Sequence, residues 1–186
     1  MGLSPTPPKI LKQEIACTSQ LFRVEALELE FSNGEQRRYE RLLGKRPAVI
    51  IAAMLDEDQI ILVNEYGAGL ERYELGLPKG KVDEGESLVD AANRELKEEA
   101  GYGARRLTLL KQMSQSPSYM QHTTQLVLAE DLYPEQVTTG DEPEPLQVNI
   151  CLLYKSDAAD DLLCVDAGWR RSIKNKQKTN PGRYAH

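Results

Sequence analysis

The sequence has few cysteines and no long apolar segment. Its three cysteines, Cys17, Cys151 and Cys164, are an odd number without a CxxC spacing, which argues against a disulfide framework and against a zinc site. No apolar run approaches the roughly 20 residues that are needed to cross a bilayer. Residues 1–8 are rich in proline and lack the basic and apolar regions of a secretion signal. We therefore expect a cytoplasmic protein that does not enter a membrane.

The sequence also has fewer basic than acidic residues. The chain has 29 acidic and 23 basic residues, and its net charge is -6. This balance disfavours attraction to nucleic acid backbones, although an anionic small molecule can bind where metal ions offset the local charge. A composition of 40% hydrophobic and 28% charged residues is typical of a globular protein. A chain of 186 residues is long enough for one domain with a core.

Short apolar segments around one amphipathic segment predict an α+β domain. The alternation of apolar and polar residues, with a hairpin signal at Asn33-Gly34, indicates strands. The expected strands are residues 21–31, 36–42, 48–55, 59–65, 107–113 and 124–130. A loop over residues 67–85 leads into a helix over residues 87–100, which ends at Gly101.

The regular pattern ends near residue 148. We expect a domain over residues 1–148, with N-terminal strands at about residues 21–43 and a catalytic core at about residues 47–148. Residues 149–186 are predicted to be an irregular tail with a basic, polar end. Two interpretations stay open. The tail is either genuine and loosely packed, or not part of the natural protein, because residues 151–166 resemble translated sequencing-adapter DNA.

The helix places carboxylates where apolar side chains are expected. At about 100° per residue, its core-facing stripe consists of Leu88, Ala91, Ala92 and Leu96. Glu95 and Glu99 fall within this stripe, one turn apart, and Glu98 lies beside them. Like charges at this spacing repel each other. The alternative is an ordinary solvated face with ion pairs, but inward carboxylates favour a site for a hard cation such as Mg²⁺ or Mn²⁺.

Together with the preceding loop, the helix contains a pattern of nine residues at fixed spacing. The pattern consists of Gly80, Glu86, Arg94-Glu95-Leu96, Glu98-Glu99 and Gly101-Tyr102. It resembles the Nudix box, in which a bulky aliphatic residue usually stands where this chain has Tyr102. A P-loop is excluded, because residues 76–82 lack its Gly-x4-Gly-Lys-Ser/Thr spacing.

The resemblance to the Nudix hydrolases extends over residues 22–146 and is closest to the bacterial hydrolases of ADP compounds. The segments that carry it are residues 29–34, 73–76, 91–99, 117–119 and 131–135. It implies a Nudix α/β/α sandwich with a mixed β-sheet and an N-terminal antiparallel sheet. It also implies a homodimer that uses two or three Mg²⁺ ions per site, or Mn²⁺, to hydrolyse ADP-ribose, NADH and diadenosine di- or triphosphate to AMP and a second phosphate.

Two other functions remain open. The substrate could be another nucleoside diphosphate sugar, or the chain could be a Nudix module that binds such ligands without cleaving them. The complete set of Glu95, Glu98 and Glu99 argues against the second alternative, because a sensor has no need of a metal cluster.

The resemblance also implies roles for single residues. Glu95, Glu98, Glu99 and the backbone carbonyl of Lys79 would bind metal, and Glu98 would also assist catalysis. Arg94 would hold a carboxylate in place. The other interpretation of Arg94 is an ordinary surface ion pair, worth about 0–1 kcal/mol.

A second acidic group lies in the loop over residues 140–145. By resemblance to the ADP-ribose pyrophosphatases, Glu142 is predicted to be the base that activates water, and Glu144 an additional metal ligand. An ordinary solvated loop is an equally good interpretation, because sequence places loops poorly.

The strand over residues 36–42 is unusually polar. Arg37, Arg38, Tyr39 and Arg41 offer guanidinium groups for phosphate and an aromatic face for adenine. By the resemblance, these residues would contact substrate across the dimer. The alternative is a solvated edge strand. His122 is expected to be only a loop residue, because neither histidine has a metal-ligand spacing.

Overall fold

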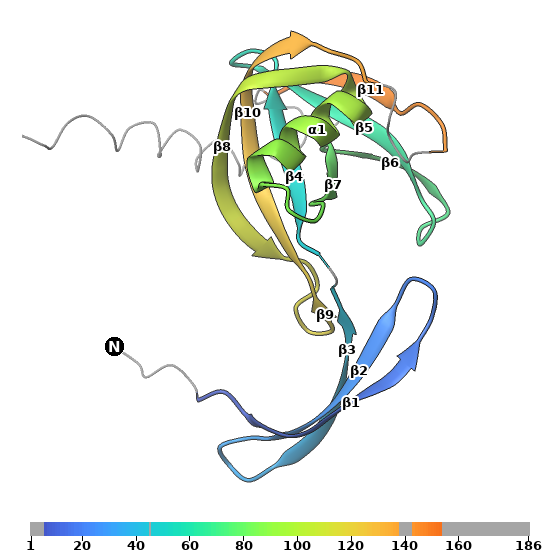
Figure 1. Cartoon of the computed structure of the whole chain (residues 1–186), viewed down its shortest axis with the longest axis vertical. Coiled ribbons are helices and arrows are strands. Elements are labelled where there is room, and N and C mark those ends of the chain that lie inside the picture. Colours follow the sequence, from blue (N-terminus) through green and yellow to red (C-terminus); the bar gives the residue numbers. More distant parts are fainter. Residues whose placement is uncertain (1–5, 45, 138–142, 154–186) are drawn as a thin grey trace, which may run out of the picture.

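A computed structural model describes residues 6–44, 46–137 and 143–153, which form two β-sheets and one helix (Figure 1). The smaller sheet comprises β1 (Lys9–Thr18), β2 (Arg23–Glu30), β3 (Gln36–Leu43) and β9 (Met120–Gln121). The larger sheet comprises β4 (Ala48–Met54), β5 (Gln59–Gly67), β6 (Arg72–Gly76), β7 (Lys79–Lys81), β8 (Tyr102–Ser114), β10 (Thr123–Pro134) and β11 (Gln147–Leu152). The helix α1 (Leu88–Ala100) packs on the larger sheet, and the smaller sheet projects away from it.

The strand pairing confirms the α+β class and the mixed sheet. The path through the larger sheet is β11-β5-β4-β10-β8, with β6 beside β5 and β7 beside β4. Among the described strands of this sheet, only β4 and β10 pair in parallel. The smaller sheet is antiparallel along β1-β2-β3, and the short β9 joins β3 in parallel. Within the described residues, α1 is the only helix, and none is long and apolar enough to span a bilayer.

Besides β11, four of the described strands were not expected from the sequence. β1 is exposed along its whole length, so it lacks the apolar alternation that marks a half-buried strand. β6 and β7 fall within the predicted loop over residues 67–85. The glycine and charged residues of this segment give no apolar alternation from which such short strands could be predicted. β9 has only two residues. These segments become strands because their backbones pair with longer neighbours.

β11 runs past residue 148, the predicted end of the domain. This strand pairs antiparallel with β5 from Gln147 to Leu152, so the sheet continues four residues beyond that point. Its side chains are exposed or half-buried, which explains the irregular pattern in the sequence. The rest of the predicted tail, residues 154–186, lies outside the described residues.

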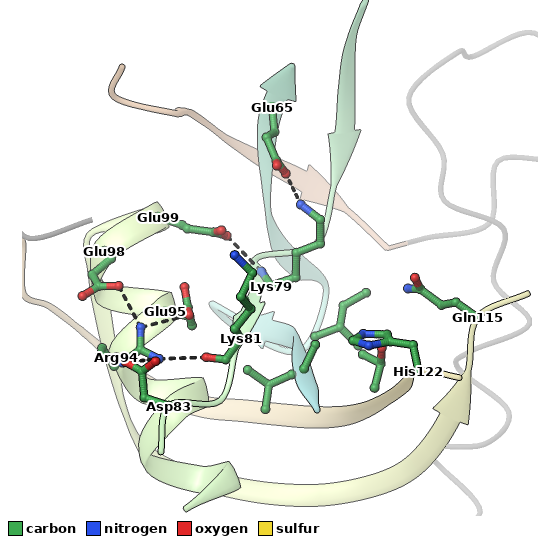
Figure 2. A pocket seen from close by; sticks show the side chains of 15 residues that line it. Glu65, Lys79, Lys81, Asp83, Arg94, Glu95, Glu98, Glu99, Gln115 and His122 are labelled. Carbon is green, nitrogen blue, oxygen red and sulfur yellow. Dashed lines mark hydrogen bonds and ion pairs between the residues drawn. The ribbon is translucent and has the colours of Figure 1, made fainter. Parts of the chain in front are cut away.

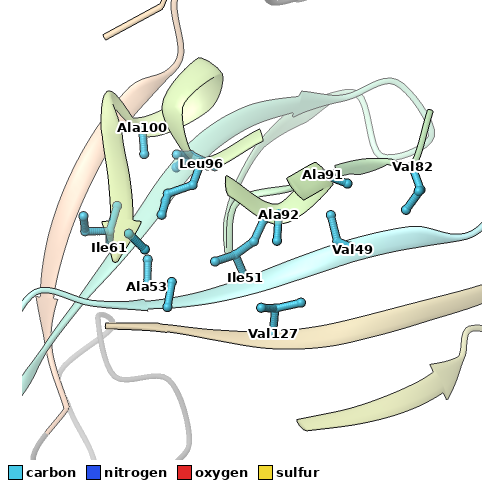
Figure 3. Packing of buried hydrophobic residues seen from close by; sticks show 13 residues of the cluster. Val49, Ile51, Ala53, Ile61, Val82, Ala91, Ala92, Leu96, Ala100 and Val127 are labelled. Carbon is cyan, nitrogen blue, oxygen red and sulfur yellow. The ribbon is translucent and has the colours of Figure 1, made fainter. Parts of the chain in front are cut away.

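The main core lies between α1 and the larger sheet (Figure 3). Ala91, Ala92 and Leu96 of the helix pack against Val49 and Ile51 of β4. The alanines let the helix approach the sheet closely. A second cluster, which includes Leu126 and Leu128 of β10, forms on the other face of the sheet, as the alternation of side chains along a strand requires.

The ends of α1 agree with the prediction. The Oγ of Ser87 accepts a hydrogen bond from the backbone N–H of Asp90 at 3.1 Å and caps the first turn. Gly101 adopts φ 72° and donates its N–H to Leu96 and Lys97 carbonyls. Because both ends are fixed, the face of each helical residue is also fixed.

Candidate active site

The acidic face of α1 lines a pocket of about 560 Å³ (Figure 2). Glu95 and Glu99 are only 9% and 8% exposed, which confirms the inward direction predicted from the helical wheel. Glu98 lies beside them on the same wall. The other lining residues are Ala48, Val49, Ile50, Glu65, Lys79, Gly80, Lys81, Asp83, Arg94, Gln115, His122 and Thr124. A pocket of this size is within the range of small-molecule sites, about 300–1,000 Å³.

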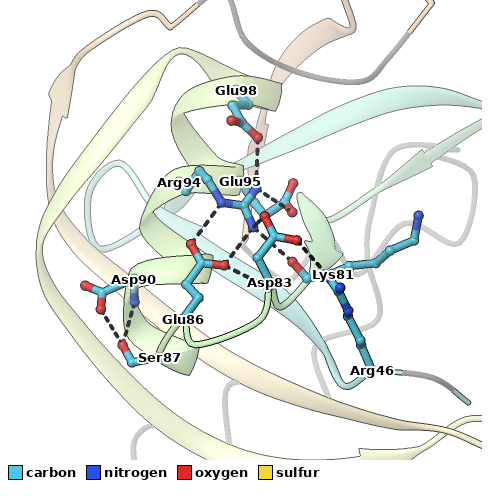
Figure 4. A network of polar contacts seen from close by, with 9 residues as sticks. All are labelled: Arg46, Lys81, Asp83, Glu86, Ser87, Asp90, Arg94, Glu95 and Glu98. Carbon is cyan, nitrogen blue, oxygen red and sulfur yellow. Dashed lines mark hydrogen bonds and ion pairs between the residues drawn. The ribbon is translucent and has the colours of Figure 1, made fainter.

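Arg94 connects the carboxylates of this wall (Figure 4). Its Nη1 donates to Glu95 at 2.9 Å and to Glu98 at 3.0 Å. Its Nε and Nη2 donate to the two carboxylate oxygens of Glu86, each at 2.9 Å. Nη2 also donates to the carbonyl of Lys81 at 2.9 Å. Arg94 therefore holds three carboxylates and one backbone segment in place, which an isolated surface ion pair does not do.

These contacts also affect proton affinity. The bidentate hydrogen bond from Arg94 lowers the pKa of Glu86, and the Glu86 carboxylate in turn raises the pKa of Arg94. Both groups therefore keep their charges at neutral pH.

The strand β7 lies directly against the helical carboxylates. The backbone N–H of Lys79 donates to Oε2 of Glu99 at 2.9 Å. A Cβ atom on Gly80 would lie 1.9 Å from Cδ of Glu95, so the carboxylate of Glu95 occupies the space that any side chain would need. The ammonium group of Lys79 forms an ion pair with Glu65 on the pocket rim. Glycine at position 80 thus allows the close approach of carboxylate and backbone.

The donor chemistry of this wall fits a hard divalent cation. Glu95, Glu98, Glu99 and the backbone at Lys79 present oxygen atoms, the ligands that Mg²⁺ and Mn²⁺ prefer. Among the described residues, no group of three or more histidine, cysteine, aspartate or glutamate side chains is arranged to hold a metal ion by itself. Arg94 bonds to two of these carboxylates directly.

Comparison with known proteins gives the family. Residues 44–161 match the NUDIX domain, and residues 8–41 match the NudE-type Nudix hydrolase N-terminal domain. The chain belongs to the Nudix hydrolases. It is 50% identical over 163 residues to the ADP compounds hydrolase NudE of Escherichia coli (strain K12), covering 87% of each chain.

Two further matches agree with this family. The chain is 33% identical over 147 residues to the ADP-ribose pyrophosphatase of Bacillus subtilis (strain 168), covering 75% of this chain and 78% of the relative. A crystal structure of an ADP compounds hydrolase superposes with a TM-score of 0.73 at 50% identity, covering 80% of each chain. Nudix hydrolases use divalent metal ions, in keeping with the oxygen donors described above.

Neither of the two predicted loop acids is among the described residues that line the pocket. Glu142 lies outside them. Glu144 accepts a hydrogen bond from the hydroxyl of Tyr73 on β6, and this bond raises the pKa of Tyr73. The structure therefore places Glu144 on the β6 side of this Nudix domain, apart from the residues that line the pocket.

The polar strand β3 lies in the smaller sheet, apart from the pocket of the same chain. Arg41 forms an ion pair with the buried carboxylate of Glu25 on β2, in which Nε at 2.8 Å and Nη2 at 2.7 Å both contact Oε2. Arg37 and Arg38 pair with exposed acidic neighbours, and the ring of Tyr39 packs against Phe31. Arg41 thus joins two strands of the sheet.

Sequence reasoning missed several residues that line the pocket. Lys81 is the last residue of β7, Asp83 lies between β7 and the helix, and Glu65 belongs to β5. Gln115, His122 and Thr124 come from the end of the β8–β10 hairpin. His122 does lie between two strands, as expected of a loop residue, but it also faces the pocket (Figure 2). No motif marks these residues, because strand pairing alone brings them together.

Proposed function

We propose that this Nudix hydrolase is a Mg²⁺-dependent pyrophosphohydrolase of ADP-linked compounds. The observation that carries the proposal is the row of Glu95, Glu98 and Glu99 along one wall of a pocket with nucleotide dimensions. The E. coli and B. subtilis relatives, named for ADP compounds and for ADP-ribose, support the substrate class. The expected substrates are ADP-ribose, NADH and diadenosine di- or triphosphate.

In the proposed reaction, water adds to one phosphorus atom, the bridging P–O bond breaks, and AMP and a second phosphate are released. Glu95, Glu98, Glu99 and the carbonyl of Lys79 would hold the metal, which neutralises phosphate charge and lowers the pKa of bound water. Arg94 positions two of these carboxylates through hydrogen bonds of 2.9 Å and 3.0 Å. We propose Glu142 as the base that takes the proton from water. We also propose Glu144 as an additional ligand, a role in which its carboxylate would leave the hydrogen bond with Tyr73.

The substrate class is tested with a panel of ADP-ribose, NADH, diadenosine triphosphate and UDP-glucose. We expect AMP release from the three adenine compounds with Mg²⁺, and background release when Mg²⁺ is chelated. Chromatography of the products identifies the bond that is cut. Cleavage of UDP-glucose in preference to all three would contradict the ADP assignment and favour another nucleoside diphosphate sugar.

We further propose that the protein is a cytoplasmic homodimer in which the smaller sheet forms the contact. Large apolar side chains of this sheet and its turns are exposed, which is typical of an interaction surface. They are Ile10, Leu11, Ile15, Leu21 and Phe22, with exposed fractions between 44% and 74%. Such a contact would allow Arg37, Arg38, Tyr39 and Arg41 to approach the partner's substrate.

The dimer is tested by sedimentation equilibrium. We expect twice the chain mass of 20.9 kDa. Removal of residues 1–43 should give a single-chain mass if the smaller sheet forms the contact. A single-chain mass for the full-length protein would contradict the dimer.

A further inference from the structure

A buried hydroxyl in the pocket wall lacks a hydrogen-bond partner among the residues that the structure describes. Thr124 on β10 lines the pocket and is only 3% exposed. Its Oγ1 makes no hydrogen bond within the described residues. Burying a hydroxyl without a partner costs stability, and such groups are rare in folded proteins. A group bound in the pocket could supply the missing partner.

Strand register places two more polar side chains beside Thr124. Ser114 of β8 pairs with Thr123 of β10, so Gln115 and His122 stand opposite each other one position beyond this pair. His122 and Thr124 are two residues apart along nearly continuous strand, which directs them to the same face. All three side chains line the pocket.

This part of the pocket lies across from the acidic helix. Figure 2 shows His122 and Gln115 on the far side of the pocket from Glu98 and Glu99. Along β10, Val127 belongs to the cluster under α1, whereas Leu126 belongs to the cluster on the opposite face. Thr124 shares the face of Leu126 because side chains alternate along the strand. The carboxylates and Thr124 therefore belong to different parts of the pocket lining, and a molecule that fills the pocket would meet them with different groups.

The chemistry of the two walls also differs. Beside the carboxylates lie the cationic side chains of Lys79, Lys81 and Arg94, the groups that bind phosphate. The far wall has an amide, an imidazole and a hydroxyl, each of which can both donate and accept hydrogen bonds. This pattern matches a sugar hydroxyl, which also donates and accepts.

The segment that carries this wall is anchored to the smaller sheet. The N–H of Gly44 donates to the carbonyl of Gln121 at 2.8 Å, and Leu42 and Leu43 of β3 pair with β9. Gly44 lies so close that a Cβ atom would be 2.1 Å from that carbonyl oxygen. The backbone next to His122 is therefore held in a defined position, as a selective binding site requires.

We propose that Gln115, His122 and Thr124 form a subsite that binds a ribose of the nucleotide through its hydroxyl groups. The proposal rests on the proposed function, because an ADP-linked compound places a ribose on each side of its diphosphate. Thr124 contributes the central hydrogen bond, and Gln115 and His122 complete the recognition of the hydroxyl groups. The subsite thereby selects ribosylated diphosphates over inorganic ones.

The test measures binding of ADP-ribose and ADP by calorimetry in the presence of a chelator, so that no turnover occurs. Thr124→Val should weaken binding of ADP-ribose about five- to tenfold, the effect of one lost hydrogen bond. Thr124→Ser keeps the hydroxyl and should bind like the unmodified protein. Thr123→Val is the matched control, because Thr123 is the exposed neighbour on the same strand.

Stability separates recognition from a structural role. Because Thr124→Val removes a buried hydroxyl that has no partner, it should raise the melting temperature by about 2–4 °C while it weakens binding. A residue that only supports the fold would lose stability and binding together. Such a joint loss would overturn the proposal.

The two ligands identify which ribose is bound. An equal loss for ADP-ribose and ADP assigns the subsite to the ribose next to adenine, and a loss for ADP-ribose alone assigns it to the second ribose. Both results support the subsite. Unchanged affinity for both ligands in Thr124→Val would overturn it, as would an equal loss in Thr123→Val.

Hydrolysis is scored separately from binding. Binding of ADP-ribose without Mg²⁺-dependent cleavage would refute the proposed hydrolysis and leave the subsite standing. Normal cleavage together with unchanged binding in Thr124→Val would refute the subsite alone. A protein that binds neither ligand would overturn both.

Discussion

Glu99→Gln is expected to lower kcat for AMP release from ADP-ribose more than about 100-fold. Mutation of a residue that only supports a metal ligand already lowers metal affinity or activity about 10- to 100-fold, and loss of a ligand should cost more. The substitution keeps the size of the side chain and removes its charge. Glu99 lines the pocket and accepts a hydrogen bond of 2.9 Å from the backbone of Lys79. A glutamine oxygen can still accept that bond, so the fold should be retained. The measurement is the initial rate at saturating Mg²⁺ and substrate.

Glu84→Gln is the matched control for this substitution. The side chain of Glu84 is 93% exposed, and its carboxylate lies 3.9 Å from the guanidinium group of Arg46. This variant should retain the activity of the unmodified protein. Mg²⁺ titration by calorimetry provides a second readout, and Glu99→Gln should weaken Mg²⁺ binding whereas Glu84→Gln should not. Full activity in Glu99→Gln would remove this carboxylate from the proposed metal site.

Gly80→Ala should reduce activity about 10- to 100-fold, because a displacement of roughly 1 Å in a catalytic group has effects of this size. The new Cβ would lie 1.9 Å from Cδ of Glu95 and about as close to both carboxylate oxygens. Either β7 or the Glu95 carboxylate must move. Arg94 also holds this carboxylate, so the displacement should extend to the hydrogen bond between Arg94 and Glu98.

Gly76→Ala tests whether a glycine substitution in this region is harmful by itself. A Cβ on Gly76 has no heavy atom within 4 Å, and Gly76 is not among the positive-φ glycines. We expect activity close to that of the unmodified protein and a change in unfolding free energy within about 0.5 kcal/mol. Equal rates for the two variants would show that the space at Gly80 does not position Glu95.

The carboxylate wall could be predicted from the sequence because local rules determine it. Ser87 and Gly101 mark the ends of the helix, and between them the apolar stripe fixes the inward face. Glu95 and Glu99 could therefore be assigned to that face without knowledge of the sheet. The fixed spacing of Gly80, Arg94 and Glu98 was enough to identify the family.

The far wall could not be predicted because it depends on pairing between distant segments. Thr124 is directed into the pocket only when β10 lies parallel to β4, with Thr124 opposite Ala48. Gln115 reaches His122 through the antiparallel pairing of β8 and β10. Periodicity in a single strand gives two possible faces and cannot say which one borders a ligand. Only the folded structure reveals that the hydroxyl of Thr124 is buried without a hydrogen-bond partner among the described residues.

The N-terminal strands illustrate another limit of sequence. β1 alternates weakly because both faces of the smaller sheet are largely open in this chain. The carboxylate of Glu25 is nevertheless buried, with Gln13 on β1 and Arg41 on β3 as its partners. This cross-strand contact holds the sheet together, whereas the sequence suggested that Arg41 contacts substrate. Contact with a partner's substrate stays a prediction.

The most direct test of the central proposal is the rate of AMP release from ADP-ribose by the full-length protein during a Mg²⁺ titration. The protein is first treated with a chelator, and product is quantified by chromatography at each Mg²⁺ concentration. We predict background release without Mg²⁺ and a rate that rises and saturates as Mg²⁺ is added. A rate that is the same in chelator and in saturating Mg²⁺, or that never exceeds background, would contradict the proposal.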